Sequence, residues 1–241
     1  MKKFFIKYCI LLVFIAPSLA IGRPNFILIG PPGSGKGTFS SIAKEAGYHH
    51  ISHGDILRTK IKENTDLGLA IKTSLEGGNF INDSVAFEVI EKEVLACLER
   101  NQPFIIDGFP RNENRFRLLV ELLTTKNLTQ NTEWIHFETT DQECLERIEG
   151  RFVCSKCFKI FNVKAKQPVL DMVCDDCKEP LGKRVGETIE NTKKRLASYR
   201  AITEPVIDLA KKQGFVIHEI NTTYSLEECL TKYRMLLEKS N

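Results

Sequence analysis

A glycine-rich segment near residue 30 constrains the fold of this 241-residue chain more than any other feature. It reads Gly30-Pro31-Pro32-Gly33-Ser34-Gly35-Lys36-Gly37-Thr38. The apolar run Asn25–Ile29 before it predicts a buried strand, and a helical pattern follows from about Thr38 to Glu45. Glycines allow successive N–H groups to form an anion-binding nest, and Lys36 lies where it can reach β- and γ-phosphates. We therefore predict a loop that binds ATP or GTP, with a chance glycine-rich turn as the alternative.

The rest of the chain alternates between strand and helix patterns. Three more apolar runs predict strands, at Phe104–Ile106, Glu133–Phe137 and Gly214–Ile220. Helical periodicity occupies the segments between them, at about 84–100, 112–126, 140–150 and 187–212. This order predicts an α/β fold with a P-loop and a doubly wound parallel sheet, whose ligand binds at the carboxyl ends of the strands. The formal net charge of +3 is too small to indicate a nucleic-acid or membrane partner by itself.

Two stretches interrupt the alternation and predict inserts on the sheet. Residues 52–81 are helical without a central strand, and residues 152–182 contain paired cysteines and little helical pattern. A further feature is Asp107, which follows the run Phe104–Ile106. Because bound triphosphates require magnesium, we expect Asp107 and Thr38 to hold the ion directly or through its waters. The alternative for Asp107 is an ordinary turn with Gly108.

Several motifs together resemble those of nucleoside monophosphate kinases. They are Gly30–Thr38, Ile51–Arg58 and Asp107-Gly108-Phe109-Pro110-Arg111. Arg147-Ile148-Glu149-Gly150-Arg151, followed by four cysteines, resembles adenylate kinases whose lid carries zinc. The resemblance runs from about residue 24 to the C-terminus. It implies a core (23–51, 82–151 and 183–241), an NMP-binding insert (52–81) and a zinc lid (152–182).

The resemblance also implies roles for individual residues. Arg58 and Arg111 would bind the phosphate of the acceptor, Arg147 would cover ATP from the lid side, and Arg151 would contact the transferring group. Arg184 and Arg195 would close from the other side, and these arginines, Arg147 apart, form the catalytic set with Lys36. The implied ATP site comprises Gly33, Ser34, Gly35, Lys36, Gly37, Thr38, Arg147, Arg151 and Tyr224. The implied NMP site comprises His53, Arg58, Asn79, Phe80, Ile81, Gly108, Arg111, Arg115, Arg184 and Arg195.

The cysteine spacing predicts a structural zinc site. Cys154-x2-Cys157 and Cys174-x2-Cys177 are separated by sixteen residues, which suits two zinc knuckles. The alternatives are two disulfides and a zinc ribbon that binds nucleic acid. Because the knuckles fall within the lid of the kinase pattern, we expect zinc to fold this insert, with no nucleic acid as partner. We expect the remaining cysteines to be buried apolar residues: Cys9, Cys97, Cys144 and Cys229.

Some positions depart from the adenylate kinase pattern, mainly around the acceptor base. Arg115 stands where the family has a Gln that reads AMP, and His53 replaces a usual Thr or Ser. Two further stretches, Val185-Gly186-Glu187 and Asn221–Tyr224, also differ from the family. A register shift that places Asn114 in the pocket is an alternative. We expect a monomeric adenylate kinase that converts ATP and AMP to two ADP with Mg²⁺. The alternatives are a UMP/CMP or other monophosphate kinase and an inactive nucleotide-binding homologue.

Residues 1–22 stand apart from the kinase pattern. A basic start, the apolar run Tyr8–Ala16 and the small residues Ser18 and Ala20 are typical of a signal peptide. The run is too short to span a membrane comfortably. ATP-dependent chemistry and closely spaced thiolates favour a reducing cytoplasm, so we expect a cytoplasmic enzyme with a spurious or dispensable leader. Export is the alternative.

Overall fold

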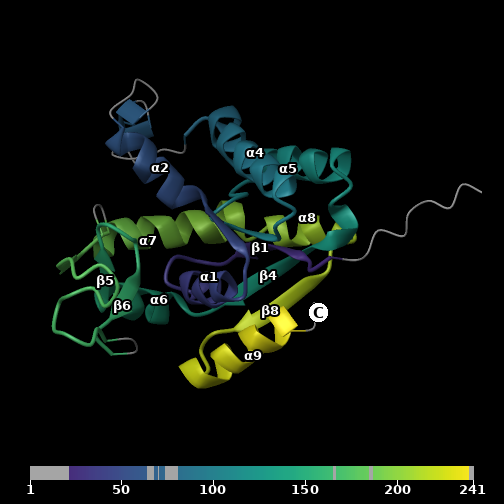
Figure 1. Ribbon diagram of the computed structural model, residues 1–241. Coiled ribbons are helices and arrows are strands. Elements are labelled where there is room, and N and C mark those ends of the chain that lie inside the picture. Colours follow the sequence, from purple (N-terminus) through teal and green to yellow (C-terminus); the bar gives the residue numbers. More distant parts are fainter. Residues whose placement is uncertain are drawn as a thin grey trace, which may run out of the picture.

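The computed structural model describes residues 22–63, 68–69, 71–73, 81–164, 167–184 and 187–238 (Figure 1). Its centre is a parallel sheet of five strands in the order β2-β3-β1-β4-β8. The strands are β1 (Asn25–Ile29), β2 (His49–Ser52), β3 (Phe104–Asp107), β4 (Thr132–Glu138) and β8 (Ile217–Asn221). The P-loop strand β1 lies in the middle, so the loop that follows it opens at the centre of the carboxyl edge of the sheet.

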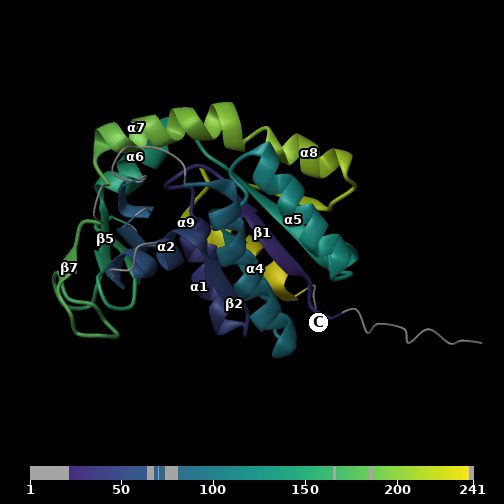
Figure 2. The same ribbon diagram turned by 90° about the horizontal axis from the view of Figure 1, so that it is seen from above.

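Helices cover both faces of this sheet. On β1, Phe26 and Leu28 pack on the face covered by α1 (Lys36–Glu45) and α9 (Leu226–Glu238). Ile27 and Ile29 pack on the opposite face with three other helices, α4 (Asp83–Glu99), α5 (Glu113–Thr125) and α8 (Val206–Lys212). Figures 1 and 2 show these two helical layers with the sheet between them. Alternating side chains that are buried on both faces explain why the strands read as continuous apolar runs.

Side chains that cap helix N-termini set several boundaries. Thr140 and Glu143 form a reciprocal capping box at the start of α6 (Asp141–Glu149). Ser52 accepts a hydrogen bond from the Asp55 N–H at the start of α2 (His53–Lys62). The caps of α4, α5 and α7 (Ile189–Ser198) are Asn82, Asn112 and Thr188. Because each cap satisfies a backbone N–H that has no partner within its helix, polar residues fix where these helices begin.

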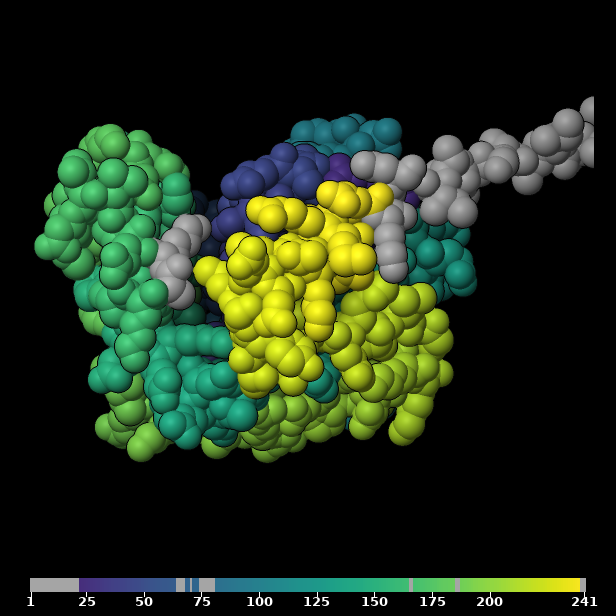
Figure 3. All heavy atoms as spheres, turned by 90° about the horizontal axis from the view of Figure 1, so that it is seen from below, coloured from purple at the N-terminus to yellow at the C-terminus, as the bar shows by residue number. Residues whose placement is uncertain are grey.

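A small antiparallel sheet lies between α6 and α7. Its order is β6-β5-β7, with β5 at Arg151–Cys154, β6 at Ile160–Asn162 and β7 at Leu181–Gly182. Its own buried cluster contains Cys154, Phe161, Cys174 and Leu181. Figure 3 shows this part of the chain in green, standing out from the body beside α9. A core of this size cannot stabilise a sheet alone, so a bound metal ion would contribute much of the stability of this small sheet.

The four predicted strands are confirmed, whereas three other features differ from expectation. β2 was not predicted, because in His49–Ser52 only Ile51 is fully buried. α9 was also not predicted. The segment 187–212 is not one helix: α7 passes into a π-helical turn at Tyr199–Thr203, and α8 begins after Pro205. The predicted leader, apart from Gly22, lies outside the described residues. Within the described ranges, the helices are too short or too polar to cross a membrane.

Candidate functional site

A cavity of about 1200 Å³ lies at the carboxyl edge of the central sheet. The P-loop, the ends of β2 and β3, the helix α7 and the small antiparallel sheet all contribute to its wall. Figure 3 shows a hollow between the green lid region and the yellow helix α9. The cavity wall includes Gly33, Ser34, Gly35, Lys36, Gly37, Thr38, His53, Arg58, Ile81, Asp107, Gly108, Arg111, Arg115, Arg147, Arg151, Arg184, Arg195 and Tyr224. Asn79 and Phe80 lie outside the described residues. Residues that are far apart in the sequence therefore meet in one site.

The P-loop has the backbone shape that anion binding requires. Gly33 and Gly35 have φ angles of 90° and 97°, which side chains other than glycine rarely adopt. A Cβ atom at Gly33 would also lie 2.8 Å from the carbonyl oxygen of Cys144. No side chain caps the N-terminus of α1, so its first N–H groups face the loop without a side-chain acceptor. This arrangement suits a phosphate, which accepts hydrogen bonds from exactly such N–H groups.

Lys36 is folded back onto the same loop. Its Nζ atom donates to the carbonyl oxygens of Gly30 at 2.7 Å and Pro31 at 2.9 Å, and to Ser34 Oγ at 3.3 Å. Burial lowers the pKa of Lys36 to about 8, and nearby Arg195 and Arg151 act in the same direction. A bound phosphate would favour the charged ammonium form of Lys36 and so raise its pKa again, which suits the residue to binding an anion.

Asp107 ends β3 inside the cavity, beside Lys36. The Nε2 atom of His50 lies 3.7 Å from its Oδ2 atom. Burial raises the pKa of Asp107, but His50 and Lys36 outweigh that effect and hold the pKa below its usual value. The carboxylate is therefore ionised at neutral pH. The Asp107 carboxylate and the Thr38 hydroxyl line the same cavity and are hard oxygen donors of the kind that Mg²⁺ prefers, so these residues fit the ion.

Several arginines line the cavity near the P-loop and the end of β3. Arg111 donates from Nε to the Gly108 carbonyl oxygen at 2.9 Å. Burial lowers the pKa of Arg111 to about 10, and Arg195 and Arg115 add to the effect. The guanidinium remains charged at neutral pH, held in a low-dielectric site where its interaction with a phosphate is strong.

Two carboxylates hold the other arginines in place. Asp55 pairs with Arg58 on the same helix, and the Nη2 atom of Arg184 lies 3.7 Å from Asp55 Oδ1. Glu187 pairs with Arg151 at 2.9 Å. The same oxygen of Glu187 lies 3.8 Å from Nη1 of Arg195 on α7. These ion pairs keep the arginines separated and oriented across the cavity.

Arg147 connects α6 with the loop after β8. Its Nη1 atom donates to Thr222 Oγ1 at 3.1 Å, and Nη2 donates to the Thr222 carbonyl oxygen. Tyr224 lies on the same loop, is half exposed, and has the Lys232 ammonium 4.6 Å from its ring centre. This side of the cavity thus presents a guanidinium and an aromatic ring beside the P-loop, a combination that suits a purine nucleotide.

The opposite side of the cavity contains His53 and Arg115. His53 is 1% exposed and packs against Phe109, and neither ring nitrogen has a hydrogen-bond partner among the residues that the structure describes. Burial chiefly, with Arg111 and Arg115 acting in the same direction, lowers its pKa to about 3, so the ring is neutral. A buried ring with unsatisfied nitrogens at the cavity wall favours a ligand as its partner.

Arg115 is anchored by the protein. Its Nε donates to Asp83 Oδ1 and its Nη2 donates to the Ile81 carbonyl oxygen, both at 2.6 Å. Asn114 also binds Asp83, at 3.0 Å, but is exposed and does not belong to the cavity wall. The register that places Asn114 in the pocket is therefore wrong. α5 points Arg115 inward because Asn112 caps the helix three residues earlier.

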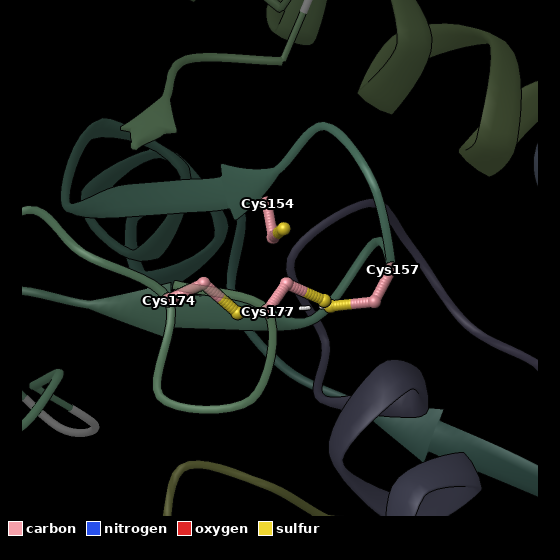
Figure 4. Close-up of side chains that lie close together, drawn as sticks. All are labelled: Cys154, Cys157, Cys174 and Cys177. Atoms are coloured by element: carbon pink, nitrogen blue, oxygen red, sulfur yellow. Dashed lines mark hydrogen bonds between the residues drawn. The ribbon is translucent and has the colours of Figure 1, made fainter. Parts of the chain in front are cut away.

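The cysteine pairs converge as their spacing predicts. The Sγ atoms of Cys154, Cys157, Cys174 and Cys177 all lie within 4.8 Å of one another (Figure 4). Cys157 and Cys174 Sγ are 3.7 Å apart, and the four thiols form no disulfide. Two disulfides are therefore excluded in this structure, and the cluster is compatible with tetrahedral zinc. As predicted, Cys97, Cys144 and Cys229 are buried, and Cys9 lies outside the described residues.

Sequence reasoning missed the carboxylates that organise the arginines. Asp83 and Glu187 were not assigned to the site, and Asp55 was seen only as part of a motif. The spacing of Asp55 and Arg58 on one helical face is a local signal for their pair. Arg115, the partner of Asp83, and Arg151, the nearer partner of Glu187, lie more than thirty residues away in the sequence, so no local pattern reveals those two pairs.

Comparisons with known proteins agree with this geometry. A sequence model described as adenylate kinase matches residues 28–215. An adenylate kinase from Treponema denticola is 34% identical over 212 residues, covering 88% of this chain and 98% of that protein. One from Carboxydothermus hydrogenoformans is 34% identical over 216 residues, covering 89% and 100%. One from Borrelia recurrentis is 38% identical over 185 residues, covering 76% and 83%. A P-loop, an acidic strand end and several arginines in one cavity thus coincide with similarity over most of the chain, and the chain belongs to the adenylate kinase family.

Proposed function

We propose that this chain catalyses reversible, Mg²⁺-dependent transfer of the γ-phosphoryl group of ATP to AMP, giving two ADP. The observation that carries the proposal is the convergence of the P-loop, Asp107 and the arginines on a single cavity. Phosphoryl transfer needs no protein nucleophile, because catalysis consists mainly of positioning and of stabilising charge on the phosphoryl oxygens. The relatives named adenylate kinase support the same reaction.

The donor nucleotide is assigned to the P-loop side. The N–H groups of Gly33 to Thr38 would bind the β- and γ-phosphates, and Lys36 would leave the loop carbonyl oxygens to reach the γ-phosphate. Arg147 and Tyr224 would lie over the base and the phosphates. Asp107 and Thr38 would hold Mg²⁺, which supplies charge neutralisation between the β- and γ-phosphates when bound.

The acceptor nucleotide is assigned to the opposite side. Arg58 and Arg111 would bind its phosphate in bidentate fashion, which orients the attacking oxygen toward the γ-phosphorus. Three further arginines would stabilise the charge that spreads over the transferring group: Arg151, Arg184 and Arg195. Arg151 and Arg195 lie within 3.8 Å of Glu187, and Arg184 lies 3.7 Å from Asp55, so each has a carboxylate partner before phosphate binds.

The division of the chain follows from these assignments. We assign the core to 23–51, 82–151 and 183–241, the NMP-binding insert to 52–81 and the zinc lid to 152–182. The lid would close over the substrates and exclude water, which limits hydrolysis of ATP. Zinc held by the four cysteines would keep the small lid sheet folded during this movement. Its four thiolates leave no open position for a substrate.

The most detailed part of the proposal is the identity of the acceptor base. Similarity to adenylate kinases favours AMP, whereas Arg115 and His53 keep a UMP/CMP or other monophosphate kinase as the second candidate. Arg115 offers only hydrogen-bond donors. Because Asp83 and the Ile81 carbonyl oxygen already bind two of them, we infer that its main role is to shape the pocket. His53, with unpartnered ring nitrogens, offers either a donor or an acceptor to the base, depending on its tautomer.

A panel of acceptors tests the function directly. ADP formation is measured with ATP and AMP, CMP, UMP, GMP or dAMP, each at the same concentration. We expect AMP to give a kcat/KM at least about tenfold above that of CMP and UMP, equivalent to about 1.4 kcal/mol of discrimination. Turnover of CMP or UMP without AMP would move the chain to the second candidate. ATP binding without turnover of any acceptor would identify an inactive homologue.

We further infer a monomer that acts in the cytoplasm without nucleic-acid or membrane partners. Four clustered thiols in metal-binding geometry favour a reducing compartment. A spurious or dispensable leader at residues 1–22 fits this location, and mass determination of the native N-terminus tests it. Sedimentation of the purified protein, with and without an oligonucleotide, tests the monomeric state and the absence of nucleic-acid binding.

A further inference from the structure

A second cavity, of about 420 Å³, lies away from the nucleotide site, where β4 pairs with the edge strand β8. His136, Glu138 and Glu219 line it together. Their nitrogen and carboxylate oxygen atoms lie within 4.8 Å of one another. None of these residues takes part in the phosphoryl transfer described above.

Sheet geometry places the three side chains on one face. His136 and Glu138 are two residues apart on β4, so their side chains point the same way. Glu219 is the direct register partner of His136 on β8. Trp134, two residues before His136, packs into the core beneath α5 and α8, which identifies the face. The backbone of two paired strands therefore fixes the three groups relative to one another.

The imidazole of His136 is prepared to bind a cation. The residue is 8% exposed, and within the described part of the chain its buried Nδ1 atom has no hydrogen-bond partner. Glu138 Oε1 lies 3.9 Å from this atom, too far for a hydrogen bond. On the other side of the ring, Nε2 lies 3.3 Å from the Tyr199 hydroxyl. When Nε2–H donates to that hydroxyl, Nδ1 carries a lone pair that faces the carboxylates, as in metal-bound histidines.

The charge around the cavity favours a divalent ion. Four carboxylates line it, from Glu138, Glu204, Asp208 and Glu219, against the two cations Arg200 and Lys211. Glu219 pairs with Lys211 at 2.8 Å, and Arg200 pairs with Glu204 at 2.7 Å. An excess of two negative charges remains within the cavity wall. A divalent cation would balance it.

We propose that His136, Glu138 and Glu219 bind a divalent cation of the first transition series, separately from the lid cysteines and the nucleotide-bound Mg²⁺. One nitrogen and two carboxylate oxygens, with the remaining positions open to solvent, form a donor set that suits Zn²⁺ and Co²⁺. Metal bonds of about 2.1 Å require ligand atoms roughly 3.4 Å apart. Glu138 and Glu219 are about half exposed, so small rotations of their side chains can reach this spacing.

Lys211 provides an internal competitor for the ion. Its ammonium holds one of the proposed ligands, and a bound cation would displace it. Lys211→Met should therefore tighten metal binding several-fold, because it frees Glu219 and removes a positive charge from the cavity wall. If these residues form only a surface ion-pair network, the wild-type protein binds no metal here and Lys211→Met has no affinity to change.

Calorimetric titration tests the proposal on untagged, nucleotide-free protein whose lid cysteines already hold zinc. With Zn²⁺ as titrant, we expect one further equivalent to bind. His136→Ala, Glu138→Gln and Glu219→Gln should each weaken it at least about tenfold, or about 1.4 kcal/mol. The two glutamine variants change half-exposed side chains, so they keep the test valid if His136→Ala fails to fold. Thermal unfolding without added metal confirms the fold of each variant.

His218→Ala is the matched control, because His218 lies on the same strand, β8, but points to the other face, where it pairs with Glu133. It should retain the further equivalent. Titration with Co²⁺ distinguishes the sites, because cobalt bound to thiolates gives strong charge-transfer absorption and cobalt bound to nitrogen and oxygen does not. The proposal is overturned if wild-type protein binds no further equivalent, or if the three ligand variants bind as wild type does.

Discussion

The buried ring of His53 should make the protein lose stability as the pH falls below neutrality. Its pKa in the folded protein is about 3, against 6.5 for an unperturbed histidine, chiefly because of burial. Between those values the unfolded chain binds a proton that the folded chain does not, so the free energy of unfolding decreases as pH decreases. Each pH unit contributes about 1.4 kcal/mol, so His53 alone should remove about 2 kcal/mol between pH 6.5 and pH 5. At pH 7 only about a quarter of the unfolded chains carry the proton, and the effect becomes small above pH 7.5.

Urea unfolding of wild-type protein and His53→Asn at several pH values between 5 and 7.5 measures this effect. Because asparagine does not titrate, the fall of about 2 kcal/mol in the free energy of unfolding between pH 6.5 and pH 5 should be missing from the variant, whatever its stability at pH 7. Thr124→Asn, which changes an exposed and uncharged side chain on α5, serves as the control and should keep the wild-type slope. Parallel pH dependences of wild-type and His53→Asn would refute the reasoning, as would an NMR titration of His53 near pH 6.5.

Three further changes test other parts of the structure. Lys36→Met should lower kcat/KM by about 10²–10³-fold without unfolding the protein, whereas Arg117→Met, which changes an exposed side chain of α5, should leave it unchanged. A small effect at Lys36 would contradict its role. Cys174→Ser should release zinc, measured with a chromogenic zinc indicator, and lower kcat at least about tenfold in the coupled assay. Retention of zinc by this variant would contradict the proposed zinc ligands. In a double-mutant cycle, Asp83→Asn and Arg115→Met should show a coupling of about 1 kcal/mol in urea unfolding, because each change alone removes the 2.6 Å ion pair between the two side chains; additive losses would argue against the pair.

The strands of the central sheet could be predicted from sequence because both of their faces are buried. Asn25–Ile29 and Phe104–Ile106 read as uninterrupted apolar runs, and a glycine or aspartate marks the end of each. β2 gave no such signal, since this edge strand is short and contains two histidines and a serine. α9 repeats a buried residue every four positions, at Cys229, Tyr233 and Leu237, and that spacing is the signal that would have identified it.

The residues of the cavity could be predicted from motifs, but their interactions could not. The position of Arg115 followed from its distance from Arg111, whereas its partner Asp83 begins another helix and meets it only in the folded chain. His136 shows the same limit on the far side of the sheet. Its register partner Glu219 is more than eighty residues away, so only the pairing of β4 with β8 brings them together. Local patterns predict elements, and the topology of the sheet determines which charged groups become neighbours.

The arrangement of charge in the nucleotide cavity connects stability with function. Burial lowers the pKa of Arg184 to about 10, and Arg58 adds to the effect, so holding such arginines charged opposes folding. Asp55 and Glu187 offset part of this cost, and each contacts two guanidinium groups rather than one. The positive charge therefore remains incompletely balanced until phosphates enter. Because ATP and the acceptor bind only the folded state, they stabilise it by mass action, and the same interactions strengthen further when charge spreads over the transferring phosphoryl group. Glu187 links Arg151, at the start of the lid sheet, to Arg195 on α7, so the entry of substrate phosphate would act at once on the lid and on the core.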